Sequence, residues 1–346
     1  MPDNSSTPSR KADHIRINLE EDVRSALTTG LEKFRFIPQA LPEIDLDHVK
    51  LDQVLFGKTV RAPILISSMT GGTQEAKNFN RILAEVAQEE RLALGVGSQR
   101  ASLEIPELAD TFQIRSFAPD ILLFANLGAV QLNYGYSLDH CQRAVDMLEA
   151  DALILHLNAL QEAVQPGGDT RFSNLAAKIE IICKKLPVPV VVKEVGWGIS
   201  GKTARLLANS GVAAIDVAGA GGTSWTQVEM HRIHDPSQAR IAAAFRDWGI
   251  PTADSIRMVR TAVPNLPVFA SGGLRDGVDI AKCIALGAVL GGMAGPFLRA
   301  AASGDAAALT FAKEIAAEIK ICMFAVGAAT LDDLRLTHLV EDGEKH

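Results

Sequence analysis

The chain has 346 residues, of which 34 are basic and 41 acidic, so its formal net charge is −7. With 47% hydrophobic and 22% charged residues, it has the composition of a globular protein, which excludes a disordered or fibrous chain. The mild acidity argues against a general nucleic-acid binder, which needs a basic excess. Four cysteines far apart, with no C-x-x-C pair, indicate neither a disulfide scaffold nor a zinc site.

The chain shows no targeting or membrane-spanning segment. Its first fourteen residues, MPDNSSTPSRKADH, are polar and lack the apolar core of a secretory signal. Two charge-free runs were candidates for a span, but residues 121–138 contain three amide side chains, and residues 283–298 are too short and contain four glycines and a proline. We therefore expect a soluble, cytoplasmic protein that binds neither membrane nor nucleic acid.

From residue 61 onward, short β-branched or Leu-rich runs alternate with longer amphipathic stretches. The predicted strands cover residues 63–68, 92–97, 120–128, 151–158, 189–195, 213–219, 267–273 and 287–293. The clearest helical patterns cover residues 75–91, 138–149, 175–185, 202–210, 252–263, 277–286 and 307–324. Strands that are apolar on consecutive positions suit a parallel sheet covered on both faces. Eight of them with intervening helices predict a (β/α)₈ TIM barrel, and no G-x-G-x-x-G follows the first strand to favour an open dinucleotide-binding sheet.

This pattern divides the chain into three segments. Residues 1–60 are predicted to be an N-terminal extension that packs on the barrel, residues 61–330 the barrel, and residues 331–346 a C-terminal tail. Residues 219–250 are too long for an ordinary barrel loop, so we expect an active-site insertion after the sixth strand.

Polar and glycine residues cluster at the C-terminal ends of the eight predicted strands. These ends open on one face of a barrel, where active sites are built. The glycine clusters after strands seven and eight stand before helices, which favours a site for a phosphate monoester over turns alone. Lys193 lies in the apolar run VVVKE and could be a Schiff-base nucleophile, a cation beside an electron-rich ring, or a surface lysine with only its stem buried. Its apolar neighbours on both sides favour an inward direction. Together these features fit flavin mononucleotide, with Thr70, Ser98 and Asn126 as ring contacts or simple strand-end caps.

A second anion site is indicated by Arg10, Lys11, His14 and Arg100, whose charges would suit a diphosphate. Basic residues in a polar N-terminus are more often simply solvated. Glu162, on the fourth loop, could hold Mg²⁺ that bridges such a diphosphate.

Several motifs make a family resemblance recognisable: SSMTGG (67–72), LGVGSQR (94–100), ANLGA (125–129), HLNALQE (156–162), VVKEVGWGIS (191–200), DVAGAGGTSW (216–225), PTADSI (251–256), FASGGLRDGVD (269–279) and MAGPFLRAA (293–301). From Arg10 to about residue 330 the chain resembles the type 2, flavin-dependent isopentenyl-diphosphate isomerases. One departure is visible, because members of that family often read P-E-G where this chain has Pro166-Gly167-Gly168. The lost carboxylate could alter the loop, but Glu162 is present.

The resemblance implies a barrel that needs reduced FMN and Mg²⁺ and interconverts isopentenyl and dimethylallyl diphosphate. It also implies NADPH as a reductant and a homo-oligomer, a tetramer or octamer. By matching motifs, the flavin contacts would be Ser68, Met69, Thr70, Ser98, Asn126, Lys193 and Thr223, with Gly273, Leu274, Arg275, Ala294 and Gly295 at its phosphate. The substrate contacts would be Arg10, Lys11, His14, Ser98, Gln99, Arg100, His156, Asn158 and Gln161, with Glu162 on the metal.

The implied reaction moves a double bond by one carbon, through a 1,3-proton shift with no net oxidation. Reduced flavin would act as the acid–base group near its N5 atom, and Lys193 would offset charge at the N1 end. Gln161 has no useful acid or base form in water, so its expected catalytic part is positioning or proton relay. The N-terminal arm, the diphosphate and the metal would orient the substrate.

Three other classes of protein remain alternatives. An FMN-dependent α-hydroxy-acid oxidase shares the barrel and the ring-side lysine, and uses a His–Arg arrangement for the substrate carboxylate. The region after the sixth strand offers Trp225, Glu229, His231 and Arg232, which does not decide between the two classes. A nucleotide dehydrogenase would need a loop cysteine, and none of the four cysteines ends a predicted strand. A non-catalytic binding barrel would not need polar residues at most of its strand ends.

Overall fold

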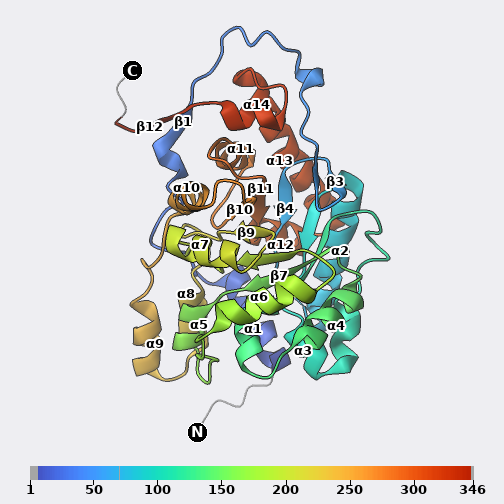
Figure 1. Ribbon diagram of the computed structural model, residues 1–346, viewed down its shortest axis with the longest axis vertical. Helices are drawn as coiled ribbons and strands as arrows, with labels where there is room; N and C mark the ends of the chain where they lie inside the picture. Colours follow the sequence, from blue (N-terminus) through green and yellow to red (C-terminus); the bar gives the residue numbers. More distant parts are fainter. Residues whose placement is uncertain (1–6, 70, 344–346) are drawn as a thin grey trace.

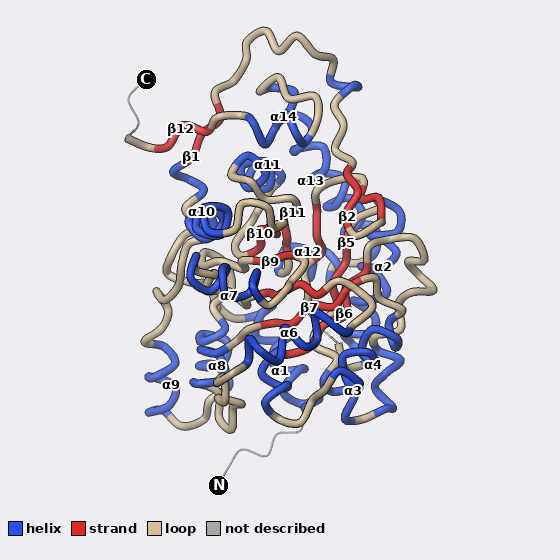
Figure 2. The backbone as a smooth tube through the Cα atoms, in the orientation of Figure 1, coloured by secondary structure: helices blue, strands red, loops and turns tan. Residues whose placement is uncertain are grey.

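The computed structural model describes residues 7–69 and 71–343, so Thr70 lies outside the described residues. Its centre is a closed barrel of parallel strands in the order β10-β11-β4-β5-β6-β7-β8-β9, wrapped by helices (Figures 1 and 2). The strands are β4 (Ile64–Ile66), β5 (Ala93–Gly95), β6 (Leu123–Gly128), β7 (Ala152–His156), β8 (Val190–Lys193), β9 (Ala214–Asp216), β10 (Val268–Ser271) and β11 (Leu290–Met293). Each lies within one of the eight predicted strands, and the (β/α)₈ barrel is confirmed.

All seven predicted helices are present within two residues of their expected bounds: α2 (Gln74–Glu90), α4 (Leu138–Leu148), α6 (Leu175–Lys185), α7 (Gly201–Asn209), α10 (Thr252–Ala262), α11 (Gly277–Ala285) and α13 (Asp305–Ala325). Their starts carry caps that sequence chemistry explains. The Thr73 hydroxyl accepts the amide of Ala76 at α2, and the Asp276 carboxylate accepts the amide of Asp279 at α11. Three short helices that were not predicted follow the ends of barrel strands: α3 (Arg100–Glu104), α5 (Ala159–Val164) and α12 (Gly295–Ala302).

The hydrophobic core has two layers. Leu65, Phe124, Ile154, Val191 and Phe269 belong to the cluster that fills the inside of the barrel. The larger cluster fills the space between the strands and the helices. Because side chains alternate in direction along a strand, residues that alternate with the inner set pack outward against the helices.

The insertion after β9 contains α8 (Trp225–Arg232) and α9 (Pro236–Ala243). The polar N-terminal stretch forms a helix, α1 (Thr7–Glu20), which packs against α8. Ile17 and Val23 are buried there against Val228. This arrangement brings α1 over the C-terminal ends of the barrel strands. An extension on the barrel was predicted, but its helical form and its contact with α8 were not.

The opposite end of the barrel carries the other flanking segments. A hairpin of β2 (Gln53–Leu55) and β3 (Lys58–Val60) places the Phe56 ring 6.4 Å from those of both Phe124 and Phe269, closing the barrel interior. The antiparallel pair β1 (Phe34–Phe36) and β12 (Leu339–Glu341) joins the N- and C-terminal segments, next to α14 (Leu331–Leu336) (Figure 1).

Candidate active site

One residue from each barrel strand, two positions beyond the apolar inner layer, forms what we call the polar ring. It consists of Ser67, Gly95, Asn126, His156, Lys193, Asp216, Ser271 and Gly292. The strand register supports this, since His156 pairs with Lys193, and Lys193 with Asp216. A side chain at Gly292 would collide with both Ser67 and Ser271, which confirms that all three face inward. The ring is a polar layer on top of an apolar barrel.

Above the polar ring lies a cavity of about 490 Å³, a size typical of small-molecule sites. Its lining combines residues from α1, the loops after the strands and the insertion. Of the residues expected in the site, it is lined by Arg10, Lys11, His14, Ser68, Met69, Ser98, Arg100, Asn126, His156, Asn158, Gln161, Glu162, Lys193, Thr223, Gly273, Leu274, Arg275, Ala294 and Gly295. Segments that are more than 280 residues apart in the chain therefore meet in one site.

Gln99 was expected to contact substrate, and the structure places its side chain elsewhere. It is fully buried, donates from Nε2 to the carbonyl of Ala144 at 2.8 Å, and accepts the amide of Asn126 at 3.0 Å. Gln99 does not line the cavity. The expectation is corrected: Gln99 holds the loop after β5 against β6 and α4, and so fixes its neighbours Ser98 and Arg100.

His156 and Asn126 are hydrogen-bonded neighbours in the polar ring, with 2.8 Å between Nδ1 and Oδ1. Burial, with the charges of Lys193 and Lys11, lowers the pKa of His156 to about 3. The imidazole is therefore neutral at pH 7, and the bond to an amide oxygen requires a proton on Nδ1. His156 can orient a ligand through Nε2, but it cannot supply a permanent positive charge to a diphosphate.

The cavity fits FMN on observations of its own residues. The hydroxyl oxygens of Ser67 and Ser68 are buried and have no hydrogen-bond partner among the described residues. Such groups are expected where a ligand supplies the missing partner, as the polar edge of the flavin ring would. At the other end, Gly273 and Ala294 line the cavity where α12 begins at Gly295. Amides at the start of a helix have no carbonyl partner in the helix, which makes them donors for a phosphate.

The opposite end of the cavity gathers three cations. Lys11 donates to the carbonyl of Ser98 at 2.6 Å, and burial, together with the charge of Arg10, lowers the pKa of its amine to about 7. Arg100 is held by two carboxylates, through Nε to Glu104 at 2.8 Å and through Nη1 to Asp169 at 2.6 Å. Burial lowers the pKa of Arg10. Clustered, partly desolvated cations of this kind are poised for a strongly anionic ligand.

Glu162 provides a carboxylate beside this cluster. It accepts bonds from Asn158 at 2.8 Å, from Gln165 at 3.1 Å and from the amide of Asp169 at 2.6 Å, and burial raises its pKa. The Oδ1 atom of Asn158 is buried without a partner in the described part of the chain. No group of three or more acidic, His or Cys side chains suited to a metal occurs among the described residues. One carboxylate and one amide oxygen fit a Mg²⁺ ion that also binds substrate phosphates.

A buried carboxylate that the sequence analysis did not assign to this site stands behind Gln161. Glu229, on α8, accepts from Gln161 Nε2 at 2.9 Å, from His14 at 3.1 Å and from Arg232 at 2.6 Å. Burial alone would raise its pKa, but these bonds and charges lower it to about 2. Glu229 thus holds the amide of Gln161 in one orientation and ties α1 to the insertion. The role of Glu229 is visible only in the structure, because its contacts form where α1, α5 and α8 meet.

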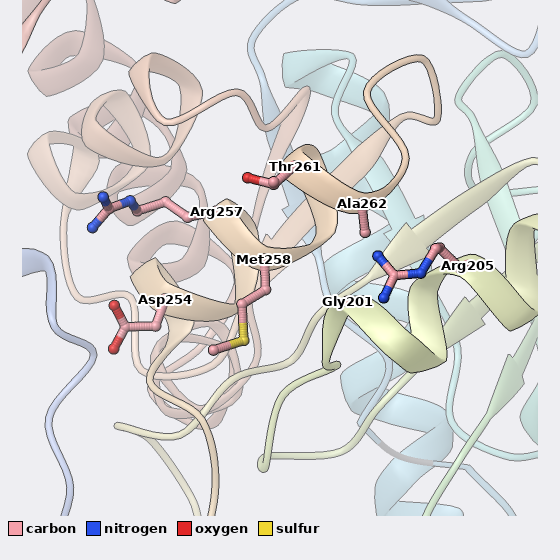
Figure 3. A pocket seen from close by; sticks show the side chains of 7 residues that line it. All are labelled: Gly201, Arg205, Asp254, Arg257, Met258, Thr261 and Ala262. Carbon is pink, nitrogen blue, oxygen red and sulfur yellow. The ribbon is translucent and has the colours of Figure 1, made fainter.

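A second cavity, of about 430 Å³, lies outside the barrel between α7 and α10 (Figure 3). It is lined by Gly201, Arg205, Asp254, Arg257, Met258, Thr261 and Ala262. None of the expected site residues lines it.

Helix-start amides, a buried lysine and a polar ring in one cavity of a (β/α)₈ barrel suit a flavin-binding barrel protein, and comparison with known proteins points to the same class. Residues 139–341 match the model of the family described as FMN-dependent dehydrogenase. The fold resembles a mandelate oxidase solved with an FMN adduct (TM-score 0.66, 19% identity, 97% of this chain and 93% of that one). It also resembles a putative lactate oxidase of Pediococcus acidilactici (TM-score 0.63, 18% identity, 96% and 87%).

Curated relatives are much closer in sequence. Proteins named isopentenyl-diphosphate delta-isomerase from a Nostoc species and a Synechocystis species are 57% and 56% identical, over 96% and 95% of this chain and 95% of each relative. One from Rickettsia africae is 49% identical over 94% of this chain and 95% of its own length. The chain belongs to the isopentenyl-diphosphate delta-isomerase family, in its FMN-dependent type 2 form. No helix in the described residues is both long and apolar enough to cross a membrane.

Proposed function

We propose that the cavity holds reduced FMN and isopentenyl diphosphate together, and that the chain interconverts this substrate with dimethylallyl diphosphate. Family membership supports the reaction. The observation that carries the assignment is a single cavity above the polar ring, whose lining combines two groups suited to anions, the amides at the start of α12 and the cations around Arg100. The first suits the phosphate monoester of FMN, and the second suits a diphosphate.

The chain's own residues would bind and orient the diphosphate. Arg10, Lys11 and Arg100 would receive its charge, and burial makes each contact stronger than it would be in water. An anion beside Lys11 would raise the pKa of its amine from about 7 and keep it protonated. Glu162 and Asn158 would hold the Mg²⁺ ion, and the bound ion would supply positive charge that offsets the charge of the diphosphate.

Bound in its reduced form, FMN would supply an electron-rich ring and an acid–base group for the 1,3-proton shift. Lys193 would compensate negative charge at one edge of that ring. Gln161 would position the isoprenoid or relay a proton, with Glu229 fixing its amide. Trp225 and Met69 would offer apolar surface to the hydrocarbon, and α1 would exclude water from the reacting carbons.

The positions of His231 and Arg232 in the insertion argue against the alternative of an α-hydroxy-acid oxidase. Its His–Arg pair would have to reach the substrate, but neither His231 nor Arg232 lines the cavity. Arg232 is 6% exposed and bonded to Glu229, and His231 lies 3.9 Å from Glu21. The likeness to mandelate and lactate oxidases therefore concerns the fold.

Three further points rest on the family resemblance. NADPH would reduce the flavin by approaching the ring face, since the sequence carries no dinucleotide-binding fingerprint. The protein would act in the cytoplasm, and it would assemble into a homo-oligomer, a tetramer or octamer.

The test is anaerobic turnover in D₂O with FMN, dithionite or NADPH, Mg²⁺ and isopentenyl diphosphate. The expected product is deuterium-labelled dimethylallyl diphosphate, formed only when the flavin is reduced. Reduction of bound flavin without isomerisation would contradict the proposed reaction while leaving the cofactor in place. In the same assay, normal turnover by Gln161→Ala would remove Gln161 from the mechanism.

A further inference from the structure

Asp216 is the acidic member of the polar ring, and it has no role so far in the proposed reaction or in cofactor binding. It is fully buried on β9, between Lys193 on β8 and Ser271 on β10. Its Oδ1 atom accepts the Ser271 hydroxyl at 2.6 Å and the amide of Ala218 at 3.2 Å. Its Oδ2 atom is buried and has no partner among the described residues. A half-satisfied carboxylate at such a depth requires a compensating interaction.

The nearest compensating charge is on the neighbouring strand. Lys193 and Asp216 are register partners, and side chains of register partners project from the same face of a sheet. Burial raises the pKa of Asp216, and the charge of Lys193 is the largest influence that opposes this rise. Lys193 itself donates to the carbonyl of Glu194 at 2.8 Å. The two side chains therefore project from the same face of neighbouring strands with opposite charges. Lys193 lines the cavity, and Asp216 lies outside its lining.

We propose that Asp216 is the counter-ion of Lys193, and that this pair, not the lysine alone, sets the charge under a bound flavin ring. Asp216 is thus a positioning residue that acts through Lys193. The carboxylate offsets part of the positive charge of the buried lysine, and so limits how strongly Lys193 stabilises an anionic reduced ring. The inference rests on the proposed binding of FMN and goes beyond it, because it concerns the ionisation of the flavin and not its presence.

Other titratable groups near this pair could influence the same equilibrium. His156, on the far side of Lys193, is neutral because its pKa is lowered to about 3. The pKa of the Glu194 carboxylate is raised by burial to about 7, and this group accepts three main-chain amides, those of residues 195–197. Lys11, whose pKa is about 7, acts on the pair's surroundings from α1. Since these three groups are the same in every variant below, differences between variants isolate the pair.

The experiment measures bound, reduced FMN without substrate, by spectrophotometric titration of its N1 proton and by the midpoint potential at several pH values. Asp216→Asn replaces the carboxylate with a neutral amide of nearly the same shape. It should therefore increase the acid dissociation constant of the N1 proton about tenfold. Lys193→Met removes the positive charge and should decrease the same dissociation constant. In the double variant the Asp216→Asn effect should be much smaller, because loss of the Lys193 charge raises the pKa of the buried carboxyl group further and favours its neutral form.

Equal effects of Asp216→Asn with and without Lys193 would overturn the pairing, as would unchanged N1 ionisation in a folded, FMN-bound Asp216→Asn protein. If Asp216→Asn does not fold, Ser271→Ala replaces it. This change removes one hydrogen bond to the carboxylate, favours its neutral form, and should shift N1 ionisation in the same direction by less. No shift in that variant overturns the inference as well. Failure of the unaltered protein to bind FMN would instead overturn the proposed function.

Discussion

Asp169 connects the two halves of the proposed diphosphate site. Its carboxylate accepts Arg100 Nη1 at 2.6 Å and Gln131 Nε2 at 2.8 Å, while its main-chain amide donates to Glu162 at 2.6 Å. A side chain at Gly168 would collide with the carbonyl of Glu162, so the loop before Asp169 can pack this closely only with glycine there. One residue thus orients both the arginine and the carboxylate expected to hold the metal.

Asp169→Asn is therefore expected to raise KM for isopentenyl diphosphate by roughly 10- to 100-fold, with a smaller change in kcat. Glu104→Gln is the matched control, because Glu104 bonds the same guanidinium but is a more exposed partner one helical turn away. Such pairs contribute little, about 0.3–0.5 kcal/mol, so its KM should change less than threefold. Steady-state kinetics at saturating Mg²⁺ provide the measurement. Equal effects of the two substitutions would contradict the role of Asp169.

Sequence reasoning found the site residues that end strands or belong to long motifs. Lys193 and His156 were predictable because strand ends converge on one face of a barrel. Asp216 was within reach of the same argument, two residues after the inward-facing Ala214, but its place in an apolar run concealed it. Glu229 and Asp169 were not predictable as partners, because their contacts depend on how α8 and a loop pack against α5. Gln99 shows the reverse error, since a residue between two site residues need not face the site.

At the level of elements, the β2–β3 hairpin closes the end of the barrel away from the cavity. Phe56 has a left-handed backbone conformation, with φ of 48°, which is unfavourable for a large side chain. The packing of the Phe56 ring near Phe124 and Phe269 offsets the cost of this backbone conformation. The hairpin is held further by an ion pair between Lys58 and Asp151, 3.3 Å apart.

Phe56→Ala is expected to lower the free energy of unfolding by about 2–4 kcal/mol, through lost burial and an unfilled space at the end of the barrel. KM for substrate should not change, because Phe56 lies at the opposite end from the cavity. Val54→Ala is the control in the same hairpin, since Val54 is 71% exposed. Denaturant unfolding measures both. A loss no greater than that of Val54→Ala would show that the hairpin does not close the barrel.

The elements predicted well were those with a strong periodic signal. All eight barrel strands carry consecutive apolar residues because both of their faces are buried. The helices α1, α3, α5, α8, α9, α12 and α14 were missed as elements. All of these except α1 have only five to eight residues, too few for a helical period to appear. α1 is mostly polar, and its few buried apolar residues acquire meaning only from the α8 surface they cover.

On the scale of the whole molecule, the cavity lining draws on the ends of the barrel strands, on α1 and on the insertion. Unfolding any part of the barrel would therefore destroy the site, so a ligand bound there stabilises the entire fold. Adding FMN at about 100 times its Kd to flavin-free protein should increase the free energy of unfolding by about 2.7 kcal/mol, and should therefore raise Tm by a few degrees. Differential scanning calorimetry makes the measurement.

Riboflavin, which lacks the phosphate, is the matched ligand for this prediction. Its effect on Tm at the same concentration should be clearly smaller, because the amides at the start of α12 would have no anion to bind. An equal effect of the two flavins would show that the proposed phosphate end contributes nothing.

The pairing of β1 with β12 has a practical consequence for handling the protein. It anchors the described C-terminal segment at the end of the molecule away from α1, whereas the described N-terminal segment begins in α1, whose residues line the cavity (Figure 1). An affinity tag or fusion partner attached at the C-terminus would leave the cavity accessible. The same addition at the N-terminus would stand only six residues before the helix that carries Arg10 and Lys11, so purification tags belong at the C-terminus.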